Sequence, residues 1–337
     1  MAAAVCREPR VGAPIEGSMM SLNREANNWL RKRFGQNVKF DEPMSKHTYF
    51  RIGGPVDALV RPRRRKDLID LIIWAGQTQQ PYMVIGDGTN LLVRDAGIRG
   101  LVIMLRKCLN NISRLDRDDD TTIISAMAGT RLQALCKFAI ESGLEGMNFA
   151  IGIPGTVGGG IVMNAGTAAG SMESVLVSIE VMLPSGERLA IERDQLVFKY
   201  RNLSLKNGTS NGDLEKTIIL EGHFRLRPSD TRYLEKEARE MWNKRRMAQP
   251  LNYASAGCFF KNPASGKTAG ELIELAGLKG KRVGGAEVSS KHANFIINTD
   301  NATAADVTAL MEIVQETVSQ IFNIELKPEV KIVGTQT

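Results

Sequence analysis

The sequence predicts an α/β protein with three lobes, and three observations support this fold class. The chain has 337 residues, of which 43% are hydrophobic, so it can form more than one core. Strand and helix patterns alternate near its start, as in a β-α-β unit. After Pro228, a charged helical pattern opens a second alternation of helices and strands. We therefore expect an α/β (α+β) chain with two lobes before residue 229 and a third lobe beyond it.

The first predicted lobe comprises residues 21–83. Apolar side chains lie at helical spacing over residues 22–34 and again over residues 66–79. Short apolar runs at residues 58–60 and 82–85 are typical of strands. The order strand, helix, strand predicts a small β-α-β lobe.

The middle lobe, residues 84–228, begins with the first of two glycine-rich loops. Residues 86–90 read Gly-Asp-Gly-Thr-Asn directly after a predicted strand. Two glycines around a small polar residue can form a tight turn whose N–H groups point one way, which suits a phosphate. The loop could equally be a tight turn and nothing more. Its spacing is not G-x-G-x-x-G with an acidic residue farther on, so a Rossmann nucleotide site is not predicted.

The second glycine-rich loop, residues 152–160, is denser. It holds five glycines and a proline among uncharged residues, and Asn164, Ala165 and Gly166 follow it. A solvated linker would carry Ser, Lys or Glu instead, so this composition suits backbone packed on a ligand. Two such loops on one scaffold indicate a cofactor with a diphosphate bound across both.

The rest of the middle lobe reads as a set of short strands around one helix. Strands are expected at residues 121–126, 177–183, 188–191 and 217–226, with a hairpin turn at residues 184–187. Thr130 is expected to cap a helix that Gly143 stops. Cys136 falls in the buried stripe of that helix, so we interpret it as a core residue.

The third predicted lobe comprises residues 229–324. Helices are expected at residues 231–247, 269–276 and 304–322, and strands near residues 283–288 and 294–297. A last strand at residues 329–333 lies in the segment 325–337, which we expect to return to the middle lobe. This arrangement predicts a separate α/β lobe inserted before the final strand.

The net charge of +7 bears on the class of partner. Basic residues cluster at residues 61–66 and 244–246, and we interpret both clusters as solvated helix ends. The positive field would attract a small polyanion. Nucleic-acid binding is the competing interpretation, but aromatic residues are only 6% of the chain and this function leaves the glycine loops unexplained. No apolar run is long enough to cross a bilayer. We expect small-molecule partners, no nucleic acid, no membrane, and a monomer.

The cysteines bear on the compartment. Cys6, Cys108, Cys136 and Cys258 show no C-x-x-C spacing, and the chain has only three histidines. This pattern predicts neither a disulfide framework nor a metal site and fits a reducing cytoplasm. Residues 1–20 lack the pattern of a secretory signal, and we expect them to form a disordered extension.

Five blocks of the sequence resemble the UDP-N-acetylenolpyruvoylglucosamine reductase (MurB) family, in the family's order. They read IGDGTNLLVRDAGIRGLVI, GLEGMNFAIGIPGTVGGGIVMNAG, FKYR, SAGCFFKNP and KPEVKIVG. The resemblance runs from about residue 22 to residue 334, nearly the whole chain. It implies a two-lobed FAD-binding module of the vanillyl-alcohol-oxidase (PCMH) type and a C-terminal α/β domain that closes over the substrate. It also implies the type of member that lacks an extra tyrosine-bearing loop in that domain.

The resemblance further implies a reaction and a cofactor site. NADPH would reduce non-covalently bound FAD, and hydride would then pass to the enolpyruvyl group of UDP-N-acetylglucosamine enolpyruvate, an intermediate of peptidoglycan precursor synthesis. Residues that match the family's FAD-binding segments are Gly86, Asp87, Gly88, Thr89, Asn90, Leu91, Gly152, Ile153, Pro154, Gly155, Thr156, Val157, Gly158, Gly159, Asn164 and Gly166. The competing enzyme class is another FAD-linked oxidase, but neither glycine loop contains a histidine for covalent flavin attachment.

Three residues match the family's catalytic positions. The fixed charge of Arg201 suits a carboxylate or a developing enolate, and Glu329 could assist the enolate or anchor Arg201. Cys258 stands where the family more often has a serine that donates a proton. A thiol with an ordinary pKa of about 8.5 is a competent acid, although a cysteine between Gly257 and two phenylalanines could also fill core space. Ser255 is the alternative donor.

The resemblance also places three residues at the substrate. Tyr200 precedes the catalytic arginine, and Asn262 matches a position that contacts the substrate in the family. Lys261 could meet the diphosphate of the substrate.

Overall fold

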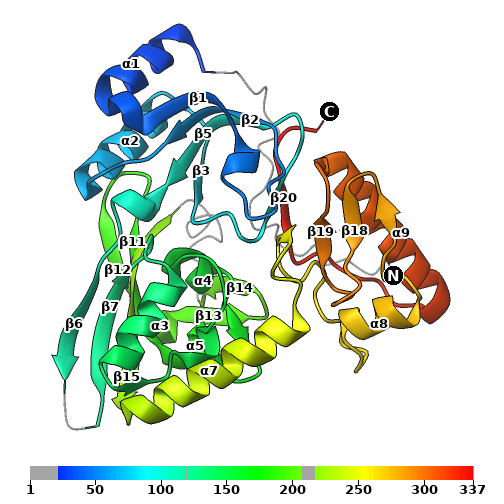
Figure 1. Ribbon diagram of the computed structural model, residues 1–337. Coiled ribbons are helices and arrows are strands. Elements are labelled where there is room, and N and C mark those ends of the chain that lie inside the picture. The colour runs from blue at the N-terminus through cyan, green and yellow to red at the C-terminus, as the bar shows by residue number, and fades with distance from the viewer. Residues whose placement is uncertain (1–21, 118–119, 207–216, 337) are drawn as a thin grey trace, which may run out of the picture.

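Three β-sheets of four or more strands organise the described part of the chain, one in each predicted lobe (Figure 1). The computed structural model describes residues 22–117, 120–206 and 217–336; the extension expected at residues 1–20 lies outside them. The first lobe lies at the top of Figure 1, the middle lobe below it, and the third lobe to the right. The predicted α/β class is confirmed.

The first sheet has the strand order β1-β2-β5-β3. Its strands are β1 (Val38–Pro43), β2 (Pro55–Val60), β5 (Ile98–Met104) and β3 (Tyr82–Ile85). β1 pairs with β2 antiparallel, whereas β5 is parallel to both β2 and β3. The sheet therefore extends through Met104, past the boundary between residues 83 and 84 that the sequence predicts. Local pattern marks β5 as a strand but does not say that it inserts between two earlier strands.

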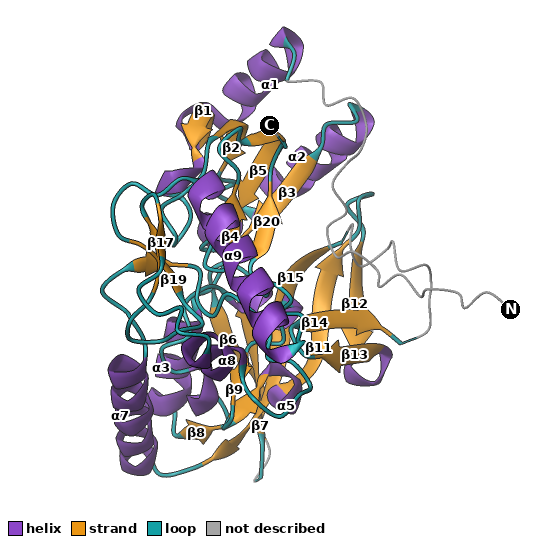
Figure 2. Ribbon diagram, turned by 90° about the vertical axis from the view of Figure 1, so that its right-hand side faces the viewer, coloured by secondary structure: helices purple, strands orange, loops and turns teal. Residues whose placement is uncertain are grey.

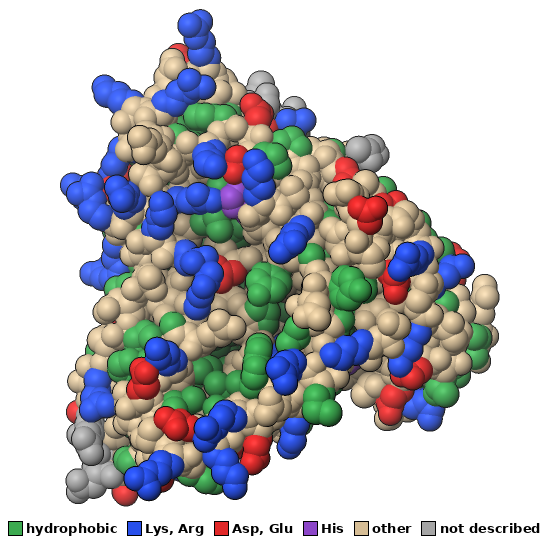
Figure 3. Space-filling view, in the orientation of Figure 1, with side chains coloured by type: hydrophobic (Ala, Val, Ile, Leu, Met, Phe, Trp, Pro, Cys, Tyr) green, Lys and Arg blue, Asp and Glu red, His purple; other side chains and the backbone are tan. Residues whose placement is uncertain are grey.

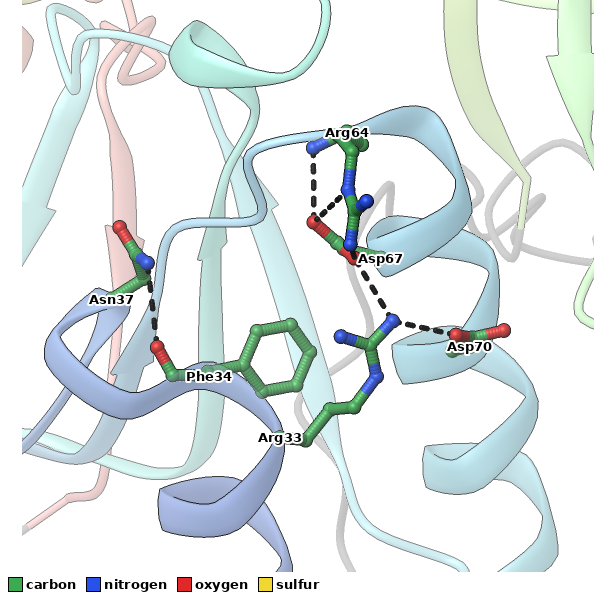
Figure 4. Close-up of polar contacts among 6 residues, drawn as sticks. All are labelled: Arg33, Phe34, Asn37, Arg64, Asp67 and Asp70. Atoms are coloured by element: carbon green, nitrogen blue, oxygen red, sulfur yellow. Dashed lines mark hydrogen bonds and ion pairs between the residues drawn. The ribbon is translucent and has the colours of Figure 1, made fainter.

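Two helices cover this lobe, α1 (Arg24–Phe34) and α2 (Arg65–Gln77). Arg33 of α1 forms ion pairs with Asp67 and Asp70 of α2, at 2.8 and 2.7 Å (Figure 4). Asp67 also accepts the main-chain N–H of Arg64, 3.1 Å away, and so caps the start of α2. One buried carboxylate thus caps the start of α2 and joins α2 to α1. Lys and Arg side chains gather over this lobe in Figure 3.

The middle lobe is built on an antiparallel sheet with the order β12-β11-β15-β7-β6, and β8 pairs with the end of β15. The strands are β6 (Ile112–Arg117), β7 (Thr122–Met127), β8 (Leu144–Glu145), β11 (Leu176–Met182), β12 (Arg188–Glu192) and β15 (Ile218–Pro228). β11 and β12 form the predicted hairpin. The other elements are α3 (Leu132–Glu141), α4 (Val157–Val162), β9 (Gly166–Thr167), β10 (Gly170–Ser171), α5 (Met172–Val175), β13 (Leu196–Lys199) and β14 (Asn202–Leu205).

One local prediction in this lobe is wrong. Thr130 does not cap α3: Arg131 is the N-cap residue, and the Thr130 hydroxyl donates to the carbonyl of Asn111, 3.3 Å away. The strand expected at residues 217–226 is β15, which ends at Pro228, and Pro228 pairs with Leu144. Cys136 is buried in the core, as predicted.

The third lobe carries a small antiparallel sheet with the order β16-β19-β18-β17. Its elements are α7 (Thr231–Ala248), β16 (Ala254–Ser255), α8 (Ala269–Leu275), β17 (Arg282–Val283), β18 (Ala286–Val288), β19 (Ile296–Asn298) and α9 (Ala304–Phe322). α7 does not lie with this sheet: it packs beside α3 of the middle lobe (Figures 1 and 2). In the described part of the chain, no helix has the length and apolar composition needed to span a bilayer.

The last strand, β20 (Lys331–Val333), returns to the centre of the molecule. It pairs in parallel with β4 (Leu91–Val93), which follows directly after the first glycine-rich loop (Figure 2). The prediction placed a longer strand, residues 329–333, in this segment. The return of the chain therefore brings the residues just before β20 to the first glycine-rich loop.

The hydrophobic cores cross the lobe limits. One core contains α1, α2 and the inner face of the middle sheet together. The core of the third lobe takes in Phe50, Ile52 and Leu92 from the first part of the chain. The three sheets are therefore packed into one continuous body, and the third lobe is less separate than the sequence predicts.

Candidate active site

A two-residue hairpin turn carries the first predicted catalytic residue. β13 and β14 pair from Leu196–Leu205 to Lys199–Asn202, so Tyr200 and Arg201 form the turn between them. Arg201 has φ +55, a left-handed conformation that non-glycine residues seldom adopt. Backbone strain of this kind is found most often at active sites and ligand-binding segments.

The side chain of Arg201 points to Glu329. Its Nε donates to Glu329 Oε1 over 2.5 Å, and both side chains are mostly buried. The Tyr200 hydroxyl donates to the other carboxylate oxygen over 3.3 Å, and the guanidinium of Arg201 lies 5.1 Å from the Tyr200 ring centroid. The structure therefore joins two predicted catalytic residues and one predicted substrate residue in a single cluster.

Glu329 is held from both sides by main-chain contacts. Its N–H donates to the carbonyl of Phe259 over 2.8 Å, and its carbonyl accepts from the Asn90 side-chain amide over 3.1 Å. Asn90 belongs to the first glycine-rich loop. One acidic residue thus connects the loop around Cys258, the hairpin turn, and the first glycine-rich loop.

The segment containing Cys258 is fixed by its buried neighbours. Phe259 donates its N–H to the Asn294 carbonyl over 2.7 Å, and the Asn294 side chain exchanges two hydrogen bonds of 2.8 Å with the backbone of Phe260. Gly257, with φ +84, allows the chain to turn before Cys258. Cys258 itself is partly exposed and belongs to none of the hydrophobic cores. This position does not suit simple core filling.

The electrostatic surroundings of Cys258 suit a proton donor. Burial and, to a lesser extent, the Glu329 carboxylate raise the pKa of its thiol to about 11, although Arg201 and Arg245 act in the opposite direction. The thiol is therefore protonated at neutral pH. The two arginines also favour the thiolate that would remain after the proton leaves.

Arg245 is a residue whose place sequence reasoning missed. We interpreted residues 244–246 as a solvated helix end, but the side chain of Arg245 is largely buried, and burial lowers its pKa. Its Nε is buried and makes no hydrogen bond among the described residues. A Cβ on Gly152 would lie 2.7 Å from Arg245 Cδ, so this side chain packs on the second glycine-rich loop. Helical spacing identifies the polar face of α7, but it does not show which residues of that face a neighbouring loop covers.

The predicted substrate residues lie around this cluster. The main-chain N–H of Asn262 faces the Tyr200 hydroxyl, whose pKa is raised by burial first and then by Glu329. The side-chain oxygen of Asn262 accepts the N–H of Ala269 at the start of α8, over 3.0 Å. The main-chain N–H of Lys261 donates to the Lys327 carbonyl over 2.9 Å. Ser255, the alternative donor, is buried in β16.

The two glycine-rich loops contact each other. The Thr89 hydroxyl lies 3.5 Å from the Pro154 carbonyl, and a Cβ on Gly155 would lie 2.9 Å from that hydroxyl. A Cβ on Gly86 would lie 2.3 Å from the hydroxyl of Thr156, so only glycine permits this approach. The prediction that both loops serve one site is consistent with this contact.

The first loop also fits a diphosphate. Within the described ranges, the main-chain N–H groups of Asp87, Gly88, Thr89 and Asn90 donate to no protein acceptor. Consecutive N–H groups in a turn form a concave site for an anion. Gly88 has φ +64, and a Cβ there would lie 2.4 Å from the His47 carbonyl. The residues present therefore fit a cofactor with a diphosphate.

Several other predicted cofactor residues have structural roles of their own. Val157 is fully buried in the core, Ile153 packs against it, and a Cβ on Gly158 would lie 2.9 Å from Ala128 Cβ. Leu91 begins β4, and Gly159 has room for a Cβ. Gly166 needs its lack of a side chain because a Cβ would lie 2.6 Å from the Gly170 carbonyl.

Asn164 links the second glycine-rich loop to the hairpin. Its side-chain amide lies 3.5 Å from the Lys199 carbonyl, next to the turn that carries Arg201. Its side-chain oxygen accepts the N–H of Glu173 over 3.1 Å. Asn164 has φ +40, one of the few non-glycine residues with a left-handed backbone.

Two family models match this chain. Residues 249–333 match the C-terminal domain of UDP-N-acetylenolpyruvoylglucosamine reductase, and residues 56–192 match an FAD binding domain. The reductase of Desulfosudis oleivorans is 45% identical over 313 residues, which cover 93% of this chain and 100% of that protein. The reductase of Geobacillus kaustophilus is 41% identical, over 89% of this chain and 94% of that protein.

The chain belongs to the UDP-N-acetylenolpyruvoylglucosamine reductase (MurB) family.

A solved structure of a reductase of this family agrees. The crystal structure of the enzyme from Thermus caldophilus superposes with a TM-score of 0.69 at 32% sequence identity, covering 88% of this chain and 97% of that one. The reductase described here is thus an FAD-dependent oxidoreductase with a two-lobed FAD-binding module and a C-terminal MurB domain. The family, the fold class and the FAD cofactor predicted from sequence are confirmed.

Proposed function

We propose that this reductase uses NADPH to reduce UDP-N-acetylglucosamine enolpyruvate to UDP-N-acetylmuramate, a step of peptidoglycan precursor synthesis. The observation that carries the proposal is the cluster of Arg201, Glu329 and Cys258 next to the first glycine-rich loop. A cation, a carboxyl group and a proton donor are the groups that reduction of an enol ether beside a carboxylate requires.

FAD, when bound across the two glycine-rich loops, supplies the hydride chemistry. The free N–H groups of residues 87–90 would hold its diphosphate. Hydride addition at the terminal carbon of the enolpyruvyl group places negative charge on the adjacent carbon and its carboxylate. Arg201 is positioned to stabilise that charge, and Glu329 fixes the orientation of the guanidinium.

Cys258 would complete the reaction by proton transfer. The S–H bond breaks, and a C–H bond forms at the carbon that carries the ether oxygen and the carboxylate. The resulting thiolate is stabilised by Arg201 and Arg245 and regains its proton from solvent. Tyr200 contacts Glu329 of this cluster, and Lys261 and Asn262 follow Cys258 closely in the chain. All three would bind the substrate, with Lys261 at its diphosphate.

An anaerobic experiment in two steps tests the proposal. The purified protein should be yellow, lose its flavin absorbance when NADPH is added, and regain it when the enolpyruvyl substrate follows. UDP-N-acetylglucosamine without the enolpyruvyl group is the control and should restore nothing. If NADPH removes the flavin absorbance and the enolpyruvyl substrate then fails to restore it, that result would rule out this substrate while leaving the flavoenzyme class intact.

We further propose a monomer that acts in the cytoplasm on small molecules, and the member type that lacks the extra tyrosine-bearing loop. The cysteines support the compartment: Cys108, Cys136 and Cys258, the three that lie in the described ranges, are all free thiols. Sedimentation analysis of the holoenzyme tests the oligomeric state, and a dimer would contradict it.

A further inference from the structure

The acidic residue of the first glycine-rich loop lies between two arginines. Asp87 is mostly buried, and its two carboxylate oxygens each lie 3.4 Å from a guanidinium nitrogen, Nη1 of Arg106 and Nε of Arg131. Both arginines remain about half exposed, 45% and 51%. Each therefore keeps N–H groups available for a ligand.

The arginines come from segments that pack on the glycine-rich loops. Arg131 forms an isolated β-bridge with Thr156, and the next residue donates its N–H to the Gly155 carbonyl over 3.0 Å. Arg106 lies in a short 3-10 helix (Leu105–Lys107) that follows β5, and Met104 of β5 pairs with Ile85, the residue directly before the first glycine-rich loop. Asp87 thus ties both glycine-rich loops to the neighbouring basic residues.

Charge decides the role of this carboxylate. FAD carries a diphosphate, and a carboxylate in contact with it would be repelled. Two arginines around one aspartate leave one net positive charge beside the free N–H groups of the loop. An arginine guanidinium matches phosphate geometry, and its orientation is set by the carboxylate it already contacts.

We propose that Asp87 is a positioning residue and that Arg106 and Arg131 supply the cationic contacts to the FAD diphosphate. This inference rests on FAD binding at the two loops and revises the sequence prediction for Asp87, which counted it among the cofactor-binding residues. Neither arginine belongs to a recognisable motif, so the sequence alone did not indicate them.

Flavin affinity of the full-length protein, stripped of flavin and titrated by fluorescence, tests the proposal. The double variant Arg106→Ala/Arg131→Ala should bind FAD about 10²-fold more weakly, since each hydrogen bond to a charged group contributes roughly a factor of ten. Its affinity for riboflavin, which has no phosphate, should change less than about twofold. Rising salt should weaken FAD binding by the wild type more than by the double variant.

Asp87→Asn separates positioning from repulsion. The amide keeps the shape but not the charge, so a positioning role predicts FAD binding weakened by about tenfold. Tighter FAD binding by Asp87→Asn would overturn the proposal, because it would mean that the carboxylate only repels the diphosphate. Lys137→Ala removes an exposed positive charge from α3 and is the matched control, with no expected change.

Two further outcomes complete the test. An equal loss of FAD and riboflavin affinity in the double variant would show that the arginines only support the loops, and would overturn their assignment to the diphosphate. If wild-type protein bound neither flavin, the proposed function itself would fail. Wild type that binds FAD, together with a double variant of unchanged FAD affinity, would overturn only the role of the arginines.

Discussion

Arg201 keeps a left-handed backbone although it is not glycine, which costs roughly 1–2 kcal/mol for a residue with a Cβ. Glycine or asparagine would fit this turn position better. An arginine persists there because the turn directs its guanidinium to Glu329. The conformation of the backbone and the chemistry of the side chain are thus coupled at one residue.

Arg201→Lys should keep a positive charge but lose the planar fork that contacts Glu329. We expect the reaction with NADPH to continue at nearly the normal rate. The reaction with the enolpyruvyl substrate should slow, by about 10² to 10³-fold for Arg201→Ala or Glu329→Ala and less for Arg201→Lys. Stopped-flow absorbance separates the two reactions. Arg188→Ala, at an exposed ion pair of the middle sheet, is the control, and equal damage to both reactions would indicate a flavin-binding defect instead.

Cys258 gives a second prediction at this scale. Cys258→Ala should react normally with NADPH. Its reduction of the enolpyruvyl substrate should be about 10² to 10⁴-fold slower, which is the range for a lost general acid. Cys258→Ser should retain substantial activity, because a hydroxyl can still donate. Unchanged transfer in folded Cys258→Ala would remove this residue from the mechanism and make Ser255 the next candidate.

The raised pKa of Cys258 predicts a pH profile. A thiol with a pKa of about 11 stays protonated from neutral pH to about pH 10, so the transfer step should be constant over that range. The rate should fall as pH approaches 11, when the donor loses its proton. In Cys258→Ser this fall should be absent. Pre-steady-state transfer rates measured across pH provide the check, and a fall centred near pH 8.5 would show an unperturbed thiol.

At the scale of elements, the start of α2 depends on one buried carboxylate. Asp67 caps the helix and pairs with Arg33 of α1 (Figure 4). We expect Asp67→Asn to lower the free energy of unfolding by about 1–3 kcal/mol, since it weakens a cap and charged hydrogen bonds together. Asp70→Asn, which breaks a more exposed pair with the same arginine, should cost at most about 1 kcal/mol. Urea denaturation monitored by circular dichroism measures both.

The same carboxylate makes stability depend on acid. Burial favours protonation of Asp67, but its hydrogen bonds with Arg64 and Arg33 outweigh burial and hold the pKa below its usual range. A lowered pKa in the folded state means that this stabilisation is present above about pH 4 and is lost as pH falls further. Wild type should therefore lose stability below about pH 4 more steeply than Asp67→Asn does.

Helices were the most predictable elements, because their signals are local. The prediction of a helix at residues 304–322 matches α9 residue for residue, since its apolar spacing lies within the segment and its capping box begins at the preceding residue, Thr303. Thr130 is not the cap because α3 begins at Leu132 with Arg131 as its N-cap residue, and the Thr130 hydroxyl instead donates to the distant Asn111 carbonyl. The place of β5 in the first sheet and the burial of Arg245 depend on partners far away in sequence, which no local pattern contains.

The site residues also fall into those that the sequence identified and those that only the tertiary structure shows. The sequence resemblance identified Arg201, Cys258 and Glu329, and the structure brings them together. It did not identify Arg106 or Arg131, because their importance comes from the packing of two loops against each other. A motif is recognised by residues at a fixed spacing in the sequence. A residue that is positioned by tertiary contacts lies at no such spacing, so a motif search does not find it.

At the scale of the whole molecule, one aspartate joins the third lobe to the first part of the chain. The two carboxylate oxygens of Asp95 accept the N–H groups of Ala304 and Ala305, each over 2.9 Å, at the start of α9. Phe50, Ile52 and Leu92 extend the core of the third lobe across the same boundary. The third lobe is therefore held by a shared core and a shared helix cap.

Asp95→Ala should remove that cap and lower the free energy of unfolding by about 1–2 kcal/mol. The flavin spectrum should stay normal, because the glycine-rich loops lie elsewhere. Glu312→Ala, on the exposed side of α9, is the matched control and should have little effect. Thermal unfolding of the holoenzyme gives the measurement, and equal stability of the two variants would mean that Asp95 contributes nothing to the attachment.

The contacts at Glu329 also determine when the site forms during folding. The pair of Glu329 with Arg201 joins residues 128 positions apart in the sequence, and its contact with Asn90 joins residues 239 positions apart. The contact between the two glycine-rich loops joins residues only 65 positions apart. Closing a longer segment costs more chain entropy before any contact offsets it, and chains rich in such contacts fold more slowly. A refolding chain should therefore bind flavin before it can turn over substrate. For some time after dilution from denaturant, the protein should therefore hold flavin but show no turnover. Flavin fluorescence and turnover followed in parallel measure the length of that interval.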